Sequence, residues 1–279
     1  MNNVSVTYFY RSCFAVGVGQ TLLLFSYTRV DDSYKDAWIS PADMAGFRHI
    51  IVFVPCASVE HVDRAAFAWP SYLPLDFVVA SSAKHLAPER DNVHLIRRGE
   101  TLRLEEAVVT ACASVDDGVS FFVNVEGLNL YHAGDFNLWH WRDEQDSRKV
   151  QAAEQAFDQA LSGLASGADL AFFPVDPRQG SLYAEGANRY MSRKQPRVLF
   201  PMHFAMNAEA INNFARIHAG RHTLVVPLLA PRASVRLDMS VDPPDVQAQA
   251  LPEAAEVKQL LSAYMGDSPF ASTDMPIRL

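Results

Sequence analysis

The sequence has little cysteine and no long apolar run. Its 279 residues include three cysteines, Cys13, Cys56 and Cys112, an odd number without a Cys-x-x-Cys pair. This excludes a disulfide framework and is typical of a reducing compartment. The apolar runs, such as residues 50–55, have the length of a strand, whereas a bilayer-spanning helix needs roughly 20 apolar residues. Residues 1–12 have no leader-peptide pattern, so we expect a cytoplasmic protein with no membrane partner.

Basic residues are also in the minority. The chain has 24 Lys and Arg against 32 Asp and Glu, which gives a net charge of −8. Nucleic acid is therefore not an expected partner, because phosphate binding requires a basic surface. The hydrophobic share of 49% and the charged share of 20% are typical of a folded globular chain. We expect its partner to be a small-molecule substrate or ligand.

Strand-like and helix-like segments alternate along the chain in two blocks. Apolar and β-branched runs predict strands at 4–10, 21–28 (after a glycine turn at 17–19), 49–54, 77–80 and 93–96. A second β block covers 102–131, with a hairpin at 126–127, and later strands follow at 168–175, 197–200, 224–226 and 234–237. Helical periodicity predicts helices at 150–164 and 207–218, and a capping pattern begins another at 40–43. This order predicts the α/β class, a four-layer αββα sandwich of two mixed sheets packed face to face with helices outside.

A change of composition marks the only candidate boundary. From residue 241 the chain is rich in Pro, Ala and Asp, with one short helix expected at 257–264. We therefore divide the chain into a domain at 1–240 and a C-terminal extension at 241–279. The extension is expected to pack on the domain or on a neighbouring subunit.

Polar side chains gather where a buried strand ends in the segment Val-Pro-Cys-Ala-Ser-Val-Glu-His at 54–61. Residues at alternate positions of an extended chain point to one side, and Cys, Glu and His can all bind metals. The residues concerned are Cys56, Ser58, Glu60 and His61. On these residues alone, a surface turn with a helix-capping serine is the favoured alternative.

A second cluster follows the strand that ends at Tyr131. The segment continues His-Ala-Gly-Asp-Phe-Asn-Leu-Trp-His-Trp, and polar groups within aromatic walls are typical of a small-molecule pocket. The candidates are His132, Asp135, Asn137, Trp139, His140 and Trp141. The alternative is a turn whose aspartate accepts backbone hydrogen bonds, but the number of converging groups favours a site. His203 ends a third strand, in Phe-Pro-Met-His-Phe. Taken alone it is a core histidine, and it becomes a candidate ligand only in combination with the other two clusters.

Taken together, these clusters resemble the metallo-β-lactamase superfamily. The resemblance covers roughly residues 4–237, and it is strongest to a bacterial subgroup of uncharacterised hydrolase-like proteins. The segments that carry it are DDGVSFFVNVEGLNLYHAGDFNLWHW, ADLAFFPVDPRQG and FPMHF. The family hallmark, His-x-His-x-Asp-His, binds one or two zinc or similar ions. Here the hallmark is degenerate, because its positions hold Cys56, Ser58, Glu60 and His61.

The resemblance implies that one of two metal sites is lost. The first site would use Cys56, Ser58 and a middle histidine, for which the chain offers only Cys112, Ser114 or Asp116. Ser26 stands where the family often has an early aspartate. The second site keeps four groups that can bind an ion: Glu60, His61, Asp135 and His203. We expect one divalent metal, with zinc first and iron or manganese as alternatives, or no metal at all.

The resemblance further implies a metal-dependent hydrolase of unknown substrate, in which the ion activates a water. Asp135 or His132 would transfer protons, and His140 would stabilise developing negative charge. Asn137, Trp139 and Trp141 would shape the pocket. Asp176 and Arg178 either lie at its rim, where Arg178 binds an anion, or form an internal ion pair. The second hypothesis is an inactive, degenerate member that binds a ligand or partner, and a homodimer is left open.

Overall fold

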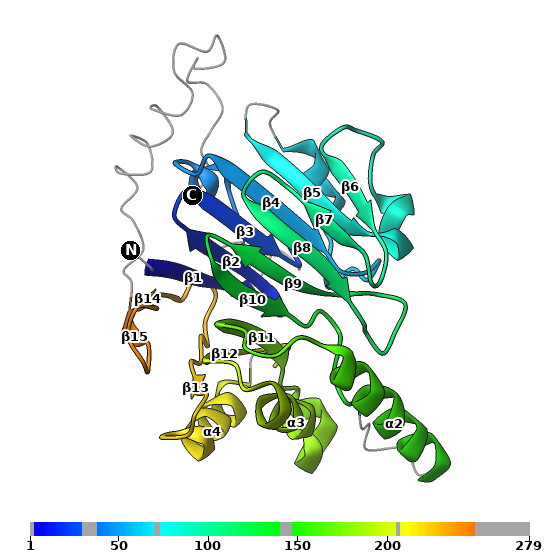
Figure 1. Cartoon of the computed structure of the whole chain (residues 1–279), viewed down its shortest axis with the longest axis vertical. Coiled ribbons are helices and arrows are strands. Elements are labelled where there is room, and N and C mark those ends of the chain that lie inside the picture. Colours follow the sequence, from blue (N-terminus) through cyan, green and yellow to red (C-terminus); the bar gives the residue numbers. More distant parts are fainter. Residues whose placement is uncertain (1–2, 30–37, 70–72, 140–146, 205–206, 249–279) are drawn as a thin grey trace.

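The computed structural model describes residues 3–29, 38–69, 73–139, 147–204 and 207–248 (Figure 1). These residues form two β-sheets. The first sheet has the strand order β15-β14-β1-β2-β3-β4-β5-β6, and the second has the order β13-β12-β11-β10-β9-β8-β7. In the first sheet the strands are β1 Asn3–Tyr10, β2 Cys13–Val18, β3 Thr21–Phe25, β4 His49–Val54, β5 Leu75–Ala80, β6 Val93–Ile96, β14 Ser234–Asp238 and β15 Asp245–Ala248. In the second they are β7 Thr101–Arg103, β8 Ala107–Cys112, β9 Ser120–Val125, β10 Leu128–His132, β11 Leu170–Pro174, β12 Val198–Met202 and β13 Leu224–Val225.

Both sheets are mixed, and their topologies are similar. Strands β1, β2 and β3 are antiparallel, and β3 to β6 then run parallel. Likewise, β7 to β10 are antiparallel, and β10 to β13 run parallel. In each half, therefore, a meander is followed by parallel strands whose carboxyl ends share one edge.

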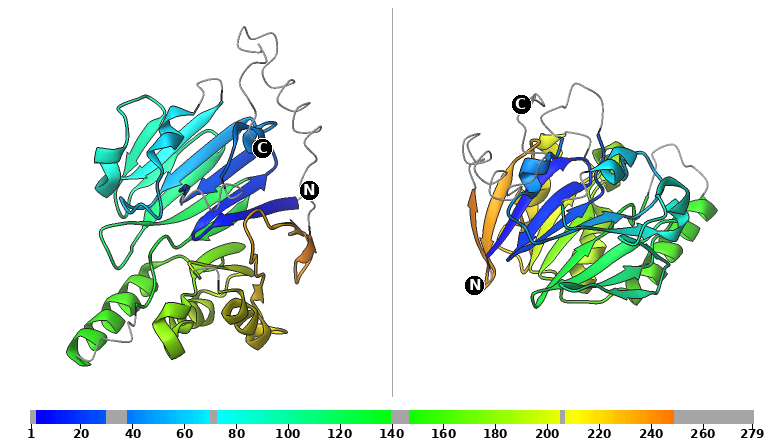
Figure 2. Two further views of the ribbon diagram at one scale, coloured as in Figure 1. Left: turned by 180° about the vertical axis from the view of Figure 1, so that it is seen from behind. Right: turned by 90° about the horizontal axis from the view of Figure 1, so that it is seen from above.

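The continuous apolar run of β4 is explained by burial on both faces of the first sheet. Ile51 and Phe53 belong to the core between the sheets, whereas Ile50, Val52 and Val54 belong to a separate core on the outer face. Side chains alternate between the two faces of a strand, so both sets must be apolar. The two sheets pack face to face (Figure 2).

Helices cover both outer faces. Helices α2 Ser147–Gly163, α3 Glu185–Lys194 and α4 Ala208–His218 lie against the second sheet (Figure 1). Tyr190 of α3, for example, stacks on Tyr131 and Phe173 with ring centroids 5.1 and 4.7 Å apart. Short elements cover the first sheet: α1 Pro41–Met44 and the 3₁₀ helices η2 Arg64–Ala68 and η3 Ser81–Leu86. The predicted four-layer sandwich is confirmed. No helix in the described part of the chain is long and apolar enough to cross a membrane.

Three elements differ from the sequence prediction. Strand β2 occupies part of the expected glycine turn, because Gly17 is a strand residue. A Cβ at Gly17 would lie 2.5 Å from the Ser5 hydroxyl and 3.1 Å from the Phe47 ring, so the close packing requires glycine. Helix α3 was not predicted, since Gly186 and many polar residues hide its apolar stripe. The start of the expected extension forms β15, which pairs with β14. The helix expected at 257–264 lies outside the described residues.

Candidate functional site

The candidate site lies where strands of both sheets end. Parallel strands place their carboxyl ends together, so the residues that follow β3, β4, β10, β11 and β12 meet at one edge. These residues are Ser26, Cys56, His61, Asp135, Asp176 and His203. Two backbone hydrogen bonds join loops of the two sheets here, from His203 to the Arg11 carbonyl (3.1 Å) and from Val119 to the Pro55 carbonyl (2.9 Å).

Three of the six non-glycine residues with a positive φ in the described part of the chain lie at this edge. Arg11, Ser26 and His203 have φ values of 51°, 54° and 62°. This left-handed conformation is unfavourable for residues other than glycine, and it is often retained at functional sites. The three strained residues come from separate loops and surround one cluster of polar groups.

His61 is fully buried and links two polar partners. Its Nδ1 lies 2.8 Å from the Ser26 hydroxyl, and its Nε2 lies 2.7 Å from Asp135 Oδ1. Burial of Asp135 would raise the pKa of its carboxyl, but the hydrogen bond from His61 and the neighbouring imidazoles lower it below the usual value. Asp135 is therefore an anion held between ring nitrogens.

Cys56 completes a compact group of three metal-binding side chains. Ligand atoms of Cys56, His61 and Asp135 all lie within 4.8 Å of one another. The Cys56 thiol points to Asp135 Oδ2 at 3.8 Å. Burial, together with the negative charge of Asp135, raises the pKa of this thiol to about 12. In the absence of a cation the thiol is therefore protonated.

His203 joins the group from the second sheet. Its Nε2 lies 3.7 Å from Asp135 Oδ1 and 3.2 Å from Glu60 Oε2. Its Nδ1 lies 3.1 Å from Asp176 Oδ2 on the opposite side of the ring. The imidazole is therefore surrounded by three carboxylates.

Glu60 lies beside the compact group and not within it. Its carboxylate forms an ion pair with Arg11, which comes from the turn between β1 and β2. Both side chains are about 30% exposed, at 31% for Arg11 and 29% for Glu60. Glu60 therefore contacts His203 from the solvent side of the site, whereas Cys56 takes a place nearer to His61 and Asp135.

The remaining hallmark candidates are placed outside the compact group. The Ser58 hydroxyl accepts a hydrogen bond from the Glu60 amide (3.2 Å) and so stabilises its own turn. Asp116 Oδ1 accepts from the Gly118 amide (3.0 Å) in the same way. The Ser114 hydroxyl is buried and has no hydrogen-bond partner among the described residues.

His132 uses both ring nitrogens within the protein. Nε2 lies 3.0 Å from the Ser12 carbonyl, and Nδ1 accepts a hydrogen bond from Gly134 at 3.2 Å. The ring stacks on Phe25 with centroids 4.7 Å apart. Burial lowers its pKa to about 3. These bonds connect the two sheets below the site, and they leave neither nitrogen directed at the compact group.

Four of the expected pocket residues lie in the described part of the chain. Trp139 packs edge-on against His203 with ring centroids 5.3 Å apart, and its indole N–H donates to the Asp135 carbonyl (2.9 Å). Asn137 is buried against α3 and lacks a hydrogen-bond partner within the described ranges. Asp176 and Arg178 form the internal ion pair that was one of two alternatives. His140 and Trp141 lie outside the described residues.

Sequence reasoning underestimated two residues. In the sequence, Ser26 only marks a replaced aspartate, and Arg11 is a weaker anion-binding candidate than Arg178. The structure brings Ser26 to His61 and Arg11 to Glu60. The available signal for Ser26 was its position at the end of an apolar strand, beside the strand that leads to His61.

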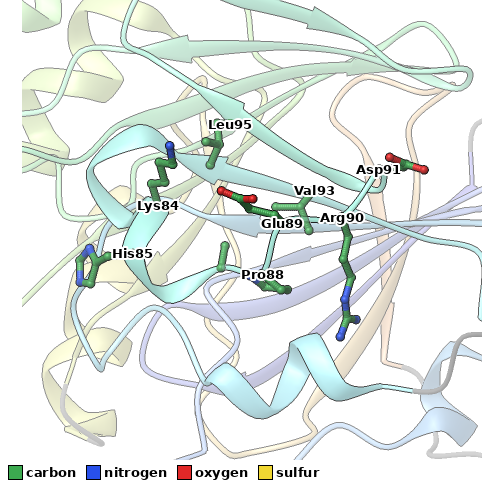
Figure 3. Close-up of a pocket in the computed structure, with 9 residues that line it drawn as sticks. Lys84, His85, Pro88, Glu89, Arg90, Asp91, Val93 and Leu95 are labelled. Atoms are coloured by element: carbon green, nitrogen blue, oxygen red, sulfur yellow. The ribbon is translucent and has the colours of Figure 1, made fainter.

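A separate hollow of about 800 Å³ lies near the β6 edge of the first sheet (Figure 3). It is lined by η3 and by the segment that leads into β6. Lys84 and Arg90 alternate there with Glu89 and Asp91, so the lining has no surplus of one charge. This hollow offers no converging metal-binding or catalytic group, and we assign the function to the strand-end site.

Comparison with solved structures confirms the fold. Igni18, a metallo hydrolase from the archaeon Ignicoccus hospitalis, matches with a TM-score of 0.57 at 18% identity, over 85% of this chain and 99% of its own. YhfI from Bacillus subtilis, a metallo-β-lactamase fold protein, matches with a TM-score of 0.52 at 12% identity, over 85% and 100%. The chain has the metallo-β-lactamase fold, as its sequence segments predicted.

The fold does not decide the reaction. CmlA, a diiron β-hydroxylase from Streptomyces venezuelae, also matches, with a TM-score of 0.53 at 12% identity, over 85% of this chain and 55% of its own. No protein-family model matches the chain, and no curated protein matches its sequence. Function must therefore be derived from the site itself.

Proposed function

We propose that the chain is a metal-dependent hydrolase that binds one divalent ion through Cys56, His61, Asp135 and His203. The convergence of Cys56, His61 and Asp135, with His203 3.7 Å from Asp135, carries the proposal. The sequence prediction placed Glu60 in this set. We assign Cys56 in its place, because the Glu60 carboxylate is paired with Arg11.

The spacing of the donors fits one shared ion, which must also keep a position open for a water. Ligand atoms at 2.0–2.3 Å from zinc lie about 3.3–3.8 Å from one another. Asp135 Oδ2 lies 3.8 Å from Cys56 Sγ, and Asp135 Oδ1 lies 3.7 Å from His203 Nε2, so each oxygen has one donor at about this distance. The shorter hydrogen bond between His61 and Asp135 would give way to bonds to the ion. One sulfur, two imidazoles and one carboxylate favour zinc over manganese, which prefers oxygen.

The remaining groups support hydrolysis. A bound divalent ion lowers the pKa of a coordinated water and polarises a carbonyl or phosphoryl oxygen. Glu60 is partly exposed and lies 3.2 Å from His203 Nε2, so its carboxylate can accept a proton at the solvent side of the site. Trp139 adds an aromatic wall beside His203 for an apolar part of the substrate.

A binding protein without catalysis is the second candidate function. Ser58 stands at a family ligand position and Ser114 is one of three candidates for another, and neither joins the compact group. In this case the site would bind its ligand without turnover, and removal of metal would change no reaction rate.

Metal content is the test of the proposal. Untagged protein is purified without chelator, and bound metals are measured by elemental mass spectrometry. We expect near one equivalent of zinc, and its loss in the Asp135→Ala and His203→Ala variants. His94→Ala is the control. His94 contacts the carboxylate of Asp76 at 2.7 Å, as His61 contacts Asp135, but it lies at another place in the first sheet.

Activity is then measured with esters, thioesters, lactones, amides and phosphodiesters. The proposal predicts a turnover that chelation abolishes and zinc restores. Absence of metal after incubation with excess zinc, or a turnover insensitive to chelation, would overturn it. Bound zinc without turnover on any of these substrates would favour the binding protein.

A further inference from the structure

Asp176 is a fully buried carboxylate that caps η4 Pro177–Leu182 at the end of β11. Its Oδ1 accepts hydrogen bonds from the Arg178 amide (3.0 Å) and from Nε (2.9 Å). Its Oδ2 accepts from Arg178 Nη2 at 2.6 Å and lies 3.1 Å from His203 Nδ1. The two-point pairing with the Arg178 guanidinium identifies Asp176 as an ionised carboxylate.

An ionised carboxylate only accepts hydrogen bonds. The short contact therefore requires a proton on His203 Nδ1. Arg178 Nη2 has a second N–H and lies 3.4 Å from the same nitrogen, but the contact of Nδ1 with Asp176 is shorter, at 3.1 Å. With Nδ1 as the donor, His203 Nε2 is the atom directed toward Glu60 and Asp135.

The other imidazole of the site has a different partner. His61 Nδ1 contacts the Ser26 hydroxyl, which can either donate or accept. Ser26 therefore does not decide which nitrogen of His61 carries the proton. The two histidines thus differ in the partner of Nδ1, which is a buried carboxylate for His203 and a hydroxyl for His61, whose Nε2 donates to Asp135.

We propose that Asp176 is a positioning residue that keeps Nδ1 of His203 protonated and so leaves Nε2 as the nitrogen that would bind the ion, in place of its contact with Glu60. A carboxylate in this place orients the ring and makes its free nitrogen a stronger donor toward a metal ion. The effect of Asp176 on metal affinity rests on the proposed function, whereas its effect on the protonation of His203 does not.

The test compares Asp176→Asn with Asp63→Asn. Asp63 also caps a 3₁₀ helix, accepts from its backbone and pairs with an arginine, Arg29, so it shares the cap and the arginine pair of Asp176 but not the histidine. Nitrogen NMR spectra of ¹⁵N-histidine-labelled, metal-free protein at one alkaline pH give the ring state. The His203 resonances are assigned from the His203→Gln variant.

We expect a protonated Nδ1 on His203 in the wild type and in Asp63→Asn, and a shift toward the Nε2-protonated form in Asp176→Asn. The affinity for zinc alone, measured by competition calorimetry, should fall about 10- to 100-fold in Asp176→Asn and remain unchanged in Asp63→Asn.

An unprotonated Nδ1 in the wild-type protein would overturn the inference without recourse to any variant. An unchanged ring state and zinc affinity in Asp176→Asn would overturn it as well. If the wild type binds no zinc, the proposed function fails, and the NMR comparison still decides the role of Asp176.

Discussion

His132 should make the stability of the protein sensitive to mild acid. The imidazole is fully buried, donates to the Ser12 carbonyl and accepts from the Gly134 amide. Burial lowers its pKa to about 3, against about 6.5 for a histidine in the unfolded chain. Between these values the unfolded state binds a proton that the folded state does not, so stability falls as the pH falls from 6.5 toward 3.

The size of the effect follows from the shift. Each pH unit within this window costs about 1.4 kcal/mol of unfolding free energy. A shift of about 3.5 units therefore removes about 5 kcal/mol in total, of which about 2 kcal/mol is lost between pH 6.5 and 5. Because a domain is stabilised by only about 5–15 kcal/mol, this single group would account for much of its acid sensitivity.

Urea unfolding at a series of pH values tests this reasoning with His132→Phe. Phenylalanine keeps the stacking on Phe25 but does not titrate. We expect the variant to be less stable near pH 7.5, by about 1–3 kcal/mol for each unsatisfied backbone group. This difference should shrink by about 2 kcal/mol at pH 5. His85→Gln, at an exposed position, should leave the pH dependence unchanged. Parallel curves for the wild type and His132→Phe would refute the reasoning.

Two further predictions concern the site and the helix beside it. Ser26→Ala removes the hydroxyl partner of His61 Nδ1, and zinc affinity measured by calorimetry should fall about 10-fold; an unchanged affinity would show that the hydroxyl does not orient the ring. Gly186→Ala places a Cβ 2.0 Å from Asn137 Oδ1, and chemical denaturation should report a loss of about 1–3 kcal/mol; a variant as stable as the wild type would contradict the tight packing of α3.

Elements with strong local patterns could be predicted from the sequence. The sequence patterns of strand β4 and of the hairpin at Glu126 and Gly127 lie within a few consecutive residues, and both elements were predicted. Helix α3 depends on its contacts with β10 and β11, through Tyr190 stacked on Tyr131 and Phe173, so its weak periodicity gave too little signal.

The sequence could predict which residues belong to the candidate site, but not which of them contact one another. Asp135, His61 and His203 follow strands, and the strand-end rule identifies them. The place of Glu60 could not be predicted, because its partner Arg11 comes from a turn about 50 residues earlier in the sequence. The neighbours β11 and β12 bring Asp176 to His203 across 27 residues, and this contact becomes visible only when the strand order is known.

The most direct test of the account is cobalt substitution, because it asks whether Cys56 binds the ion. Metal-free protein is titrated with Co²⁺ and followed by absorption spectroscopy. The account predicts one equivalent of Co²⁺ and a thiolate-to-cobalt charge-transfer band in the near ultraviolet. The band should be lost in Cys56→Ser and retained in Glu60→Gln and in Cys112→Ser, a control at the end of β8. A wild-type spectrum without this band, or one that Cys56→Ser does not change, would contradict the ligand set of Cys56, His61, Asp135 and His203.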